Sequence, residues 1–136
     1  SMSKQIFVNL PVADLAKAKA FYTAIGHSIN PKFSDDNAAC VVISDTIYVM
    51  LLVHPFFQGF TTKAICNTAT HIEALLALSS ESRADVDAVM EKALAAGGKE
   101  PSPARDLGFM YQRTFDDLDG HTWEVFHMDE AAFPGA

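Results

Sequence analysis

The chain has 136 residues, of which 49% are hydrophobic and 20% are charged, a composition typical of a globular protein rather than a disordered one. Its formal charge of −7 argues against nucleic acid as a partner, because phosphate contacts need a basic face. No apolar run is long enough to span a bilayer, no signal peptide is recognisable and the two cysteines are far apart, so we expect a cytoplasmic protein without a membrane partner.

The first half of the chain predicts a β-α-β-β-β pattern. Residues 5–12 alternate as a strand does, and Pro11 indicates an edge strand or a strand end. A helix follows, with Asp14 as N-cap and Gly26 as its end. Three strands are expected over residues 27–33 (broken at Pro31), 38–44 and 46–54. Residues 55–70 should be an irregular linker whose three phenylalanines pack over an opening or an interface.

The second half repeats the same pattern. A strand is expected over residues 73–79, and Ser82 is the candidate N-cap of a helix that the glycines at 97 and 98 end. Residues 99–103 are either a short strand or an extended loop, and residues 108–115 and 121–128 are the last two strands.

Two copies of one pattern predict an α+β fold made of two βαβββ modules in a single domain. The modules cover about residues 4–54 and 71–129, with the linker over residues 55–70. A ferredoxin-like sandwich is the alternative, but each half of this chain has more strands than that fold needs.

Two motifs carry a family resemblance. Residues 7–15 (FVNLPVADL), followed by Phe21-Tyr22 and Ile25-Gly26, form the first, and residues 116–125 (DDLDGHTWEV) form the second. Together they resemble the glyoxalase / bleomycin resistance protein / dioxygenase superfamily, also called the vicinal oxygen chelate superfamily. The resemblance implies a U-shaped mixed sheet with helices on its convex face. It also implies a small ligand, and commonly a divalent metal, on the concave face.

The ligand positions that the resemblance implies are Phe7, Met50, Leu75 and Glu124. Phenylalanine and leucine have no donor atom, and a methionine thioether suits soft metals. We therefore predict no metal site of the usual kind and no cofactor; a divalent metal is suggested by the resemblance alone. Glu124 is the only matched ligand position. It could act as a general base or as an acceptor for a ligand, or it could be a remnant that a neighbouring hydroxyl or amide satisfies.

Strand alternation predicts which residues share a face with Phe7 and Glu124. They form a mainly apolar hollow, the usual composition of a small-molecule pocket. The candidate ligand-binding residues on this face are Phe7, Asn9, Tyr48, Met50, Leu52, His54, Leu75 and Phe126. His54 could line the mouth of the pocket or be a solvated residue at a strand end. Tyr111 and Arg113 could fix an anionic ligand; alternatively, Arg113 pairs with Asp116 or Asp117 at the surface.

Three functions are compatible with this pattern. The first is a small-molecule-binding protein of the superfamily that lacks the usual metal. The second is a lyase resembling glyoxalase I, or a dioxygenase, with a displaced metal or with Glu124 as general base. In the third, the concave face is only a packing surface. A homodimer is expected in each case, because strand edges and apolar linker residues need partners.

Overall fold

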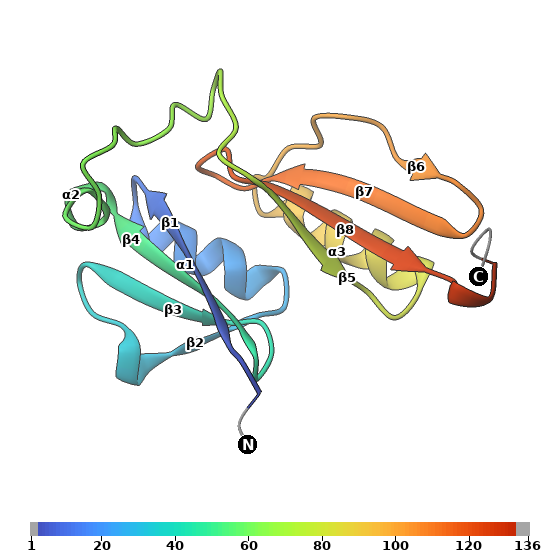
Figure 1. The fold of residues 1–136 in the computed structure, drawn as a ribbon, viewed down its shortest axis with the longest axis horizontal. Coiled ribbons are helices and arrows are strands. Elements are labelled where there is room, and N and C mark those ends of the chain that lie inside the picture. Colours follow the sequence, from blue (N-terminus) through green and yellow to red (C-terminus); the bar gives the residue numbers. More distant parts are fainter. Residues whose placement is uncertain (1–2, 133–136) are drawn as a thin grey trace. The chain divides into compact units, whose positions relative to one another are not determined.

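A computed structural model describes residues 3–132 of the chain. The chain divides into two compact units, one ending at Asn67 and the next beginning at Thr68, and each is described by itself. Both contain a four-stranded mixed sheet and a helix against one face of that sheet. The expected α+β fold with two βαβββ modules is therefore confirmed (Figure 1).

The first unit has the strand order β1-β4-β3-β2. Its strands are β1 (Ile6–Val12), β2 (Ser28–Asn30), β3 (Ala38–Val42) and β4 (Ile47–Val53), and β1 runs parallel to β4. Helix α1 (Leu15–Ala24) packs on β3 and β4, a short helical turn η1 (Pro31–Phe33) follows β2, and helix α2 (His54–Gln58) follows β4. Pro11 does lie in an edge strand, as predicted.

The second unit has the equivalent strand order β5-β8-β7-β6. Its elements are β5 (Leu75–Ser79), α3 (Arg83–Ala95), β6 (Arg105–Asp106), β7 (Met110–Asp116), β8 (Thr122–Met128) and the turn η2 (Glu130–Ala132). Helix α3 packs on β7 and β8, and β5 runs parallel to β8. Within residues 3–132, no helix has the length and apolar character that crossing a membrane requires.

Both predicted N-caps are present. Asp14 accepts a hydrogen bond from the Lys17 N–H at 3.0 Å, and the hydroxyl of Ser82 accepts one from the Asp85 N–H at 3.0 Å. Each bond satisfies a donor that the first turn of a helix leaves without an intrahelical partner. Beyond the end of α1, Gly26 has a φ of 111°, a conformation that disfavours any residue with a Cβ.

Helices α1 and α3 each bury a narrow apolar stripe against their sheet. Phe21 and Tyr22 of α1 are almost completely buried, and each such side chain stabilises the fold by about 1.5–3 kcal/mol. Val86 and Met90 of α3 are fully buried one helical turn apart, whereas Leu94, near the end of the same helix, is 39% exposed. Truncation of Phe21 to alanine would remove one of the two large buried rings of α1.

Two local predictions were wrong. Residues 54–58 form helix α2 rather than a strand end and an irregular linker, because Pro55 fits the first turn of a helix. Residues 31–33 form a helical turn rather than part of a strand. Of the two alternatives for residues 99–103, the extended loop is correct: Lys99 makes only an isolated bridge to Asp116, and the short strand β6 lies further along, at Arg105–Asp106.

Candidate functional site

The face of the first sheet opposite α1 carries most of the predicted ligand-binding side chains. Along the parallel pair β1 and β4, Phe7 lies beside Tyr48 and Asn9 lies beside Met50. The rings of Phe7 and Tyr48 are stacked, with centroids 4.6 Å apart. Val49, which points to the other face of β4, is fully buried. The predicted alternation of β4 is therefore correct.

The second sheet repeats this register. Leu75 lies beside Thr122, and Ala77 lies beside Glu124. Leu75 and Glu124 thus occupy in the second unit the positions that Phe7 and Met50 occupy in the first. Glu124 is half-buried, and the side-chain amide of Gln112 donates a hydrogen bond to its Oε2 at 2.8 Å.

A cavity of about 810 Å³ lies entirely within the first unit. Its floor is the open face of the sheet, and its sides are η1 with the loop after it and the segment from α2 to Thr61. The volume falls within the range of small-molecule sites, about 300–1,000 Å³. The residues that line it are Asn9, Lys32, Phe33, Ser34, Asp35, Ala38, Met50, Leu52, Phe56, Phe57, Phe60 and Thr61.

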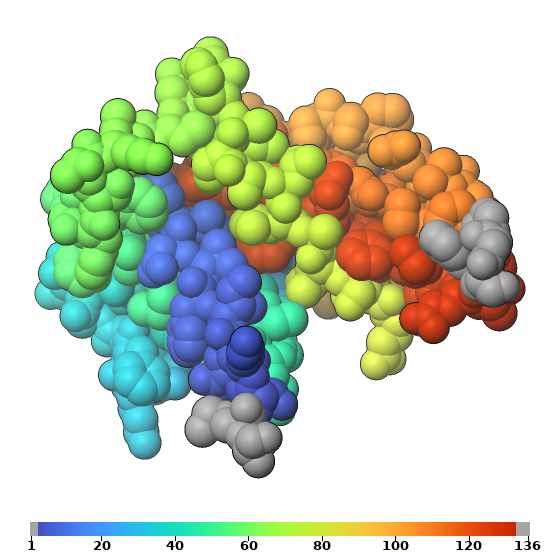
Figure 2. All heavy atoms as spheres, viewed as in Figure 1, coloured from blue at the N-terminus to red at the C-terminus, as the bar shows by residue number. Residues whose placement is uncertain are grey.

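Aromatic side chains dominate the α2 side of this cavity. Phe56 and Phe60 meet edge to face with ring centroids 5.2 Å apart, and Phe57 lies between them in sequence. Gln58 holds the turn after α2 by donating hydrogen bonds to the carbonyl oxygens of Thr61 and Lys63, at 3.1 and 2.8 Å. In Figure 2 the green atoms of this segment lie against the blue atoms of β1, with which α2 is in contact.

Local hydrogen bonds also fix the η1 side. The Ser34 hydroxyl donates to the carbonyl of Asn30 at 2.7 Å and accepts from the Cys40 N–H at 3.0 Å. Asp35 Oδ1 accepts the N–H groups of Asn37 and Ala38 at 2.8 and 3.0 Å. Both sides of the cavity are therefore held in place by bonds within the unit.

A sequence model of the family described as "Bleomycin resistance protein-like N-terminal" matches residues 4–44. Among curated proteins, none matches the chain. A hypothetical protein from S. aureus is 27% identical, with 93% of this chain and 95% of that chain covered and a TM-score of 0.78. A glyoxylase/bleomycin resistance protein/dioxygenase domain from Frankia sp. EAN1pec is 26% identical, with 96% and 95% covered and a TM-score of 0.70. TnmS3 from Streptomyces sp. CB03234, described as an antibiotic binding protein, is 18% identical, with 94% and 98% covered and a TM-score of 0.66, and shares the fold.

In its fold and over residues 4–44, the chain is similar to the glyoxalase/bleomycin resistance protein/dioxygenase superfamily.

The four positions at which this superfamily commonly holds a metal do not offer a suitable donor set here. Phe7 and Leu75 have no donor atom, Met50 offers a soft thioether, and Glu124 is the single carboxylate. No three His, Cys, Asp or Glu side chains within residues 3–132 gather in a way that could hold a metal ion. These residues do not fit a hard divalent ion of the kind that a glyoxalase or a dioxygenase uses.

Three of the predicted ligand-binding residues line the cavity: Asn9, Met50 and Leu52. Phe7 and Tyr48 share their face of the sheet but lie outside the lining, and the exposed His54 begins α2. In the second unit, Leu75 and Phe126 share a face with Glu124, so the predicted set is divided between the units.

Sequence reasoning missed the η1 side of the cavity, including Lys32 and Phe33, because the turn that forms this side was predicted as a strand. It did single out the three linker phenylalanines, which line the cavity.

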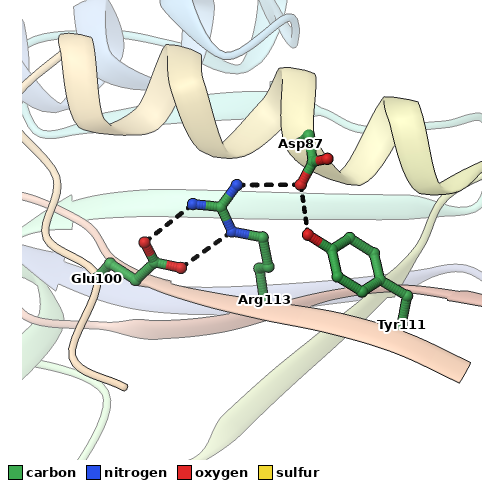
Figure 3. Close-up of polar contacts among 4 residues, drawn as sticks. All are labelled: Asp87, Glu100, Tyr111 and Arg113. Atoms are coloured by element: carbon green, nitrogen blue, oxygen red, sulfur yellow. Dashed lines mark hydrogen bonds and ion pairs between the residues drawn. The ribbon is translucent and has the colours of Figure 1, made fainter. Parts of the chain in front are cut away.

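Tyr111 and Arg113 lie on the other face of the second sheet, toward α3, so they do not meet Glu124 (Figure 3). Arg113 binds Glu100 and, at 3.0 Å, Asp87 of α3. The predicted alternative partners, Asp116 and Asp117, were therefore wrong. The Tyr111 hydroxyl donates to Asp87 Oδ1 at 2.6 Å, and the guanidinium of Arg83 lies 4.5 Å from the centre of the Tyr111 ring.

This network shifts the acidity of its members. The hydrogen bond from Tyr111, followed by that from Arg113, lowers the pKa of Asp87, because both stabilise the ionised carboxylate. The same bond raises the pKa of Tyr111, since ionisation of the phenol would remove the donor. The arrangement ties a helix to a strand, and in Figure 3 the one guanidinium, of Arg113, pairs with the two carboxylates of Asp87 and Glu100.

The histidines near Glu124 have structural partners. His121 is buried, and its ring Nδ1 is hydrogen-bonded to the Glu73 carboxylate. The backbone N–H of His121 donates to Asp117 Oδ1 at 2.9 Å. His127 places Nδ1 3.0 Å from the carbonyl oxygen of Ser80. Both contacts join the segment around β5 to the ends of β8 and do not direct an imidazole at Glu124.

Proposed function

We propose that this protein binds a small, largely apolar molecule in the cavity of its first unit, without the divalent metal that its superfamily commonly uses. The observation that carries the proposal is the cavity of about 810 Å³, which a methionine floor and four phenylalanines make predominantly apolar. The related fold of TnmS3, described as an antibiotic binding protein, supports a binding role.

The hydrogen bonds within each side of the cavity support the same proposal. A site whose sides are already fixed loses little conformational entropy when a ligand enters, so affinity is retained. Gln58 makes two such bonds on the α2 side of the cavity. Asp35 makes two on the η1 side. Exposed phenylalanines around a hollow are costly in water, and a ligand would cover them.

Calorimetric titration and thermal shift with a panel of apolar ring compounds would test the proposal. Met50→Trp should abolish binding, because the larger ring fills the floor, and Phe57→Ala should weaken it about tenfold by removing part of a wall. Leu107→Ala is a matched control, since Leu107 is an exposed apolar residue of the second unit. Equal loss in the control, or unchanged affinity in Met50→Trp, would contradict the proposal.

A catalytic role is the second candidate. Glu124 retains a carboxylate at a superfamily ligand position, is half-buried and has a single amide donor, Gln112. In a lyase or dioxygenase it would serve as a general base. Glu124→Gln keeps the shape and removes the base. Turnover of thiol conjugates or catechols that disappears in this variant would favour the enzyme, and turnover that persists would remove Glu124 from the mechanism.

Homodimerisation and a cytoplasmic location belong to the same proposal. The first sheet has β1 and β2 as its edge strands, and edges of this kind pair readily with other chains. Neither Cys40 nor Cys66 forms a disulfide within residues 3–132, which suits a reducing compartment. Light scattering of the purified protein would distinguish a dimer from a monomer.

A further inference from the structure

The aromatic residues of the first-unit cavity come from both of its sides. Phe33 belongs to η1, which contacts β3, whereas Phe57 and Phe60 belong to the α2 segment, which contacts β1 and β4. Phe33 is 65% exposed and Phe60 is 71% exposed. Two exposed ring systems on the sides of one hollow suit a flat ring that can stack on one and meet the other edge on.

The charges that line the cavity differ in how far they are already neutralised. Asp35 is engaged by two backbone N–H groups, which stabilise its negative charge. Lys32 is also exposed in the lining, and its ammonium makes no hydrogen bond or ion pair with any residue of the 3–132 range. Lys32 is therefore a lining cation that a ligand anion could reach without breaking an existing contact, whereas Asp35 is held in place through its Oδ1.

We infer that the ligand is a planar aromatic acid, whose ring lies between Phe33 and the α2 phenylalanines and whose anionic group pairs with the Lys32 ammonium. This inference rests on the proposed function and adds the chemical class of the ligand. A charge-assisted bond from an ammonium to a carboxylate is stronger than a neutral bond, and it acts here beside apolar walls. Asn9 lies in the floor of the same cavity and offers an amide donor to a polar group of the ligand.

The opposite charge preference is the informative alternative. The protein carries a formal charge of −7, which draws cations toward it at low salt. An aromatic amine would also gain from the aromatic faces and from Asp35, but it would meet Lys32 in the same cavity. The local arrangement and the overall charge thus predict opposite ligand preferences, and one series of compounds can separate them.

The test uses one ring with three substituents: naphthoate, naphthylmethanol and naphthylmethylamine. Each is titrated by calorimetry into the full chain and into three variants. Lys32→Met keeps the apolar stem and removes the charge, and Lys32→Arg restores the charge. Lys17→Met is the matched control, because Lys17 is an exposed lysine of the same unit, on α1 and away from the cavity.

We expect naphthoate to bind about tenfold more tightly than naphthylmethanol, since a charge-assisted bond contributes at least that factor. Lys32→Met should remove this preference and leave the affinity for naphthylmethanol within about twofold, and Lys32→Arg should restore it. Lys17→Met should change nothing. Equal affinity for the acid and the alcohol, or tighter binding of the amine, overturns the inference and leaves the proposed binding function standing. Failure of all three compounds to bind overturns both.

Discussion

Arg113 binds both carboxylate oxygens of Glu100, with Nε 3.0 Å from Oε2 and Nη2 2.9 Å from Oε1. Its remaining terminal nitrogen lies 3.0 Å from Asp87, so one guanidinium connects the loop before β6, the strand β7 and the helix α3. The Arg113 side chain is only 18% exposed, and its fork geometry matches a carboxylate better than an ammonium would.

Replacing Arg113 with methionine should lower the free energy of unfolding by about 2 kcal/mol. The variant keeps the apolar stem but leaves Glu100 and Asp87 without their cation, and hydrogen bonds to charged groups contribute about 1.5–3 kcal/mol. Urea unfolding followed by circular dichroism measures the change. Arg105→Met is the control, because Arg105 is exposed on β6 and its side chain makes no hydrogen bond or ion pair within residues 3–132. A similar loss in both variants would contradict the role of the network.

The stabilising effect of Asp87 should depend on pH. Tyr111 and Arg113 lower the pKa of Asp87 in the folded protein. As the pH falls to the unfolded pKa of about 3.9, the unfolded chain therefore binds a proton at Asp87 before the folded protein does. The contribution is therefore complete above about pH 4 and is lost as the pH falls further. The difference in unfolding free energy between wild type and Asp87→Asn should be largest near neutral pH and shrink toward pH 3.

A control separates this effect from general acid denaturation. Asp36 is exposed in the first unit, and no hydrogen bond or ion pair involves its side chain in the part of the chain described. Asp36→Asn should follow the wild type across the same pH range. If the difference in unfolding free energy between wild type and Asp87→Asn stayed constant with pH, the lowered pKa of Asp87 would not be the cause of the pH dependence.

Gly120 should be far less tolerant of alanine than Gly108, although both have positive φ, of 79° and 81°. At Gly108 an added Cβ meets nothing, so only the backbone strain remains, about 1–2 kcal/mol. At Gly120 the Cβ would lie 2.5 Å from the hydroxyl oxygen of Thr68, and that hydroxyl donates to the Asp119 carbonyl. We expect Gly120→Ala to lower the free energy of unfolding by about 3 kcal/mol or more.

A double variant tests the cause of that difference. Combining Gly120→Ala with Thr68→Gly removes the side chain that the new Cβ would meet and should recover part of the loss. Comparison with Thr68→Gly alone gives the interaction energy in a double-mutant cycle. Strict additivity of the two changes would show that the clash is not the reason.

Purified protein should bind no stoichiometric Zn²⁺, Ni²⁺ or Mn²⁺ at Glu124. Of the four ligand positions that the resemblance implies, Phe7, Met50, Leu75 and Glu124, only Glu124 offers a hard donor. Elemental analysis after incubation with each ion and desalting measures this, with Glu124→Gln treated in parallel. One ion per chain that is lost in Glu124→Gln would contradict the prediction.

The repeated architecture could be predicted because it is encoded locally. Alternation set the faces of β4 and β8, and the N-caps Asp14 and Ser82 set where the helices begin, since both signals lie within a few residues of the structure they specify. The period-two pattern also placed Asn9 and Met50 on the face that forms the cavity floor.

The sides of the cavity could not be predicted in the same way. The strand β2 has only three residues and passes directly into η1, so no periodicity separates strand from turn around Lys32. The partners of Arg113 come from another element and another loop, at sequence separations of 26 and 13. Long-range pairing of this kind depends on how strand and helix pack, which alternation within one strand does not determine.

Floor and sides of the cavity originate in different kinds of structure. The floor belongs to a sheet whose register recurs in the second unit, whereas the sides are short segments, residues 31–35 and 54–61, that are closed by their own hydrogen bonds. Those two segments can be exchanged by loop grafting while the repeated scaffold is left untouched. Ligand preference in this protein is therefore open to redesign through these two short segments, while the residues of the sheets are kept unchanged.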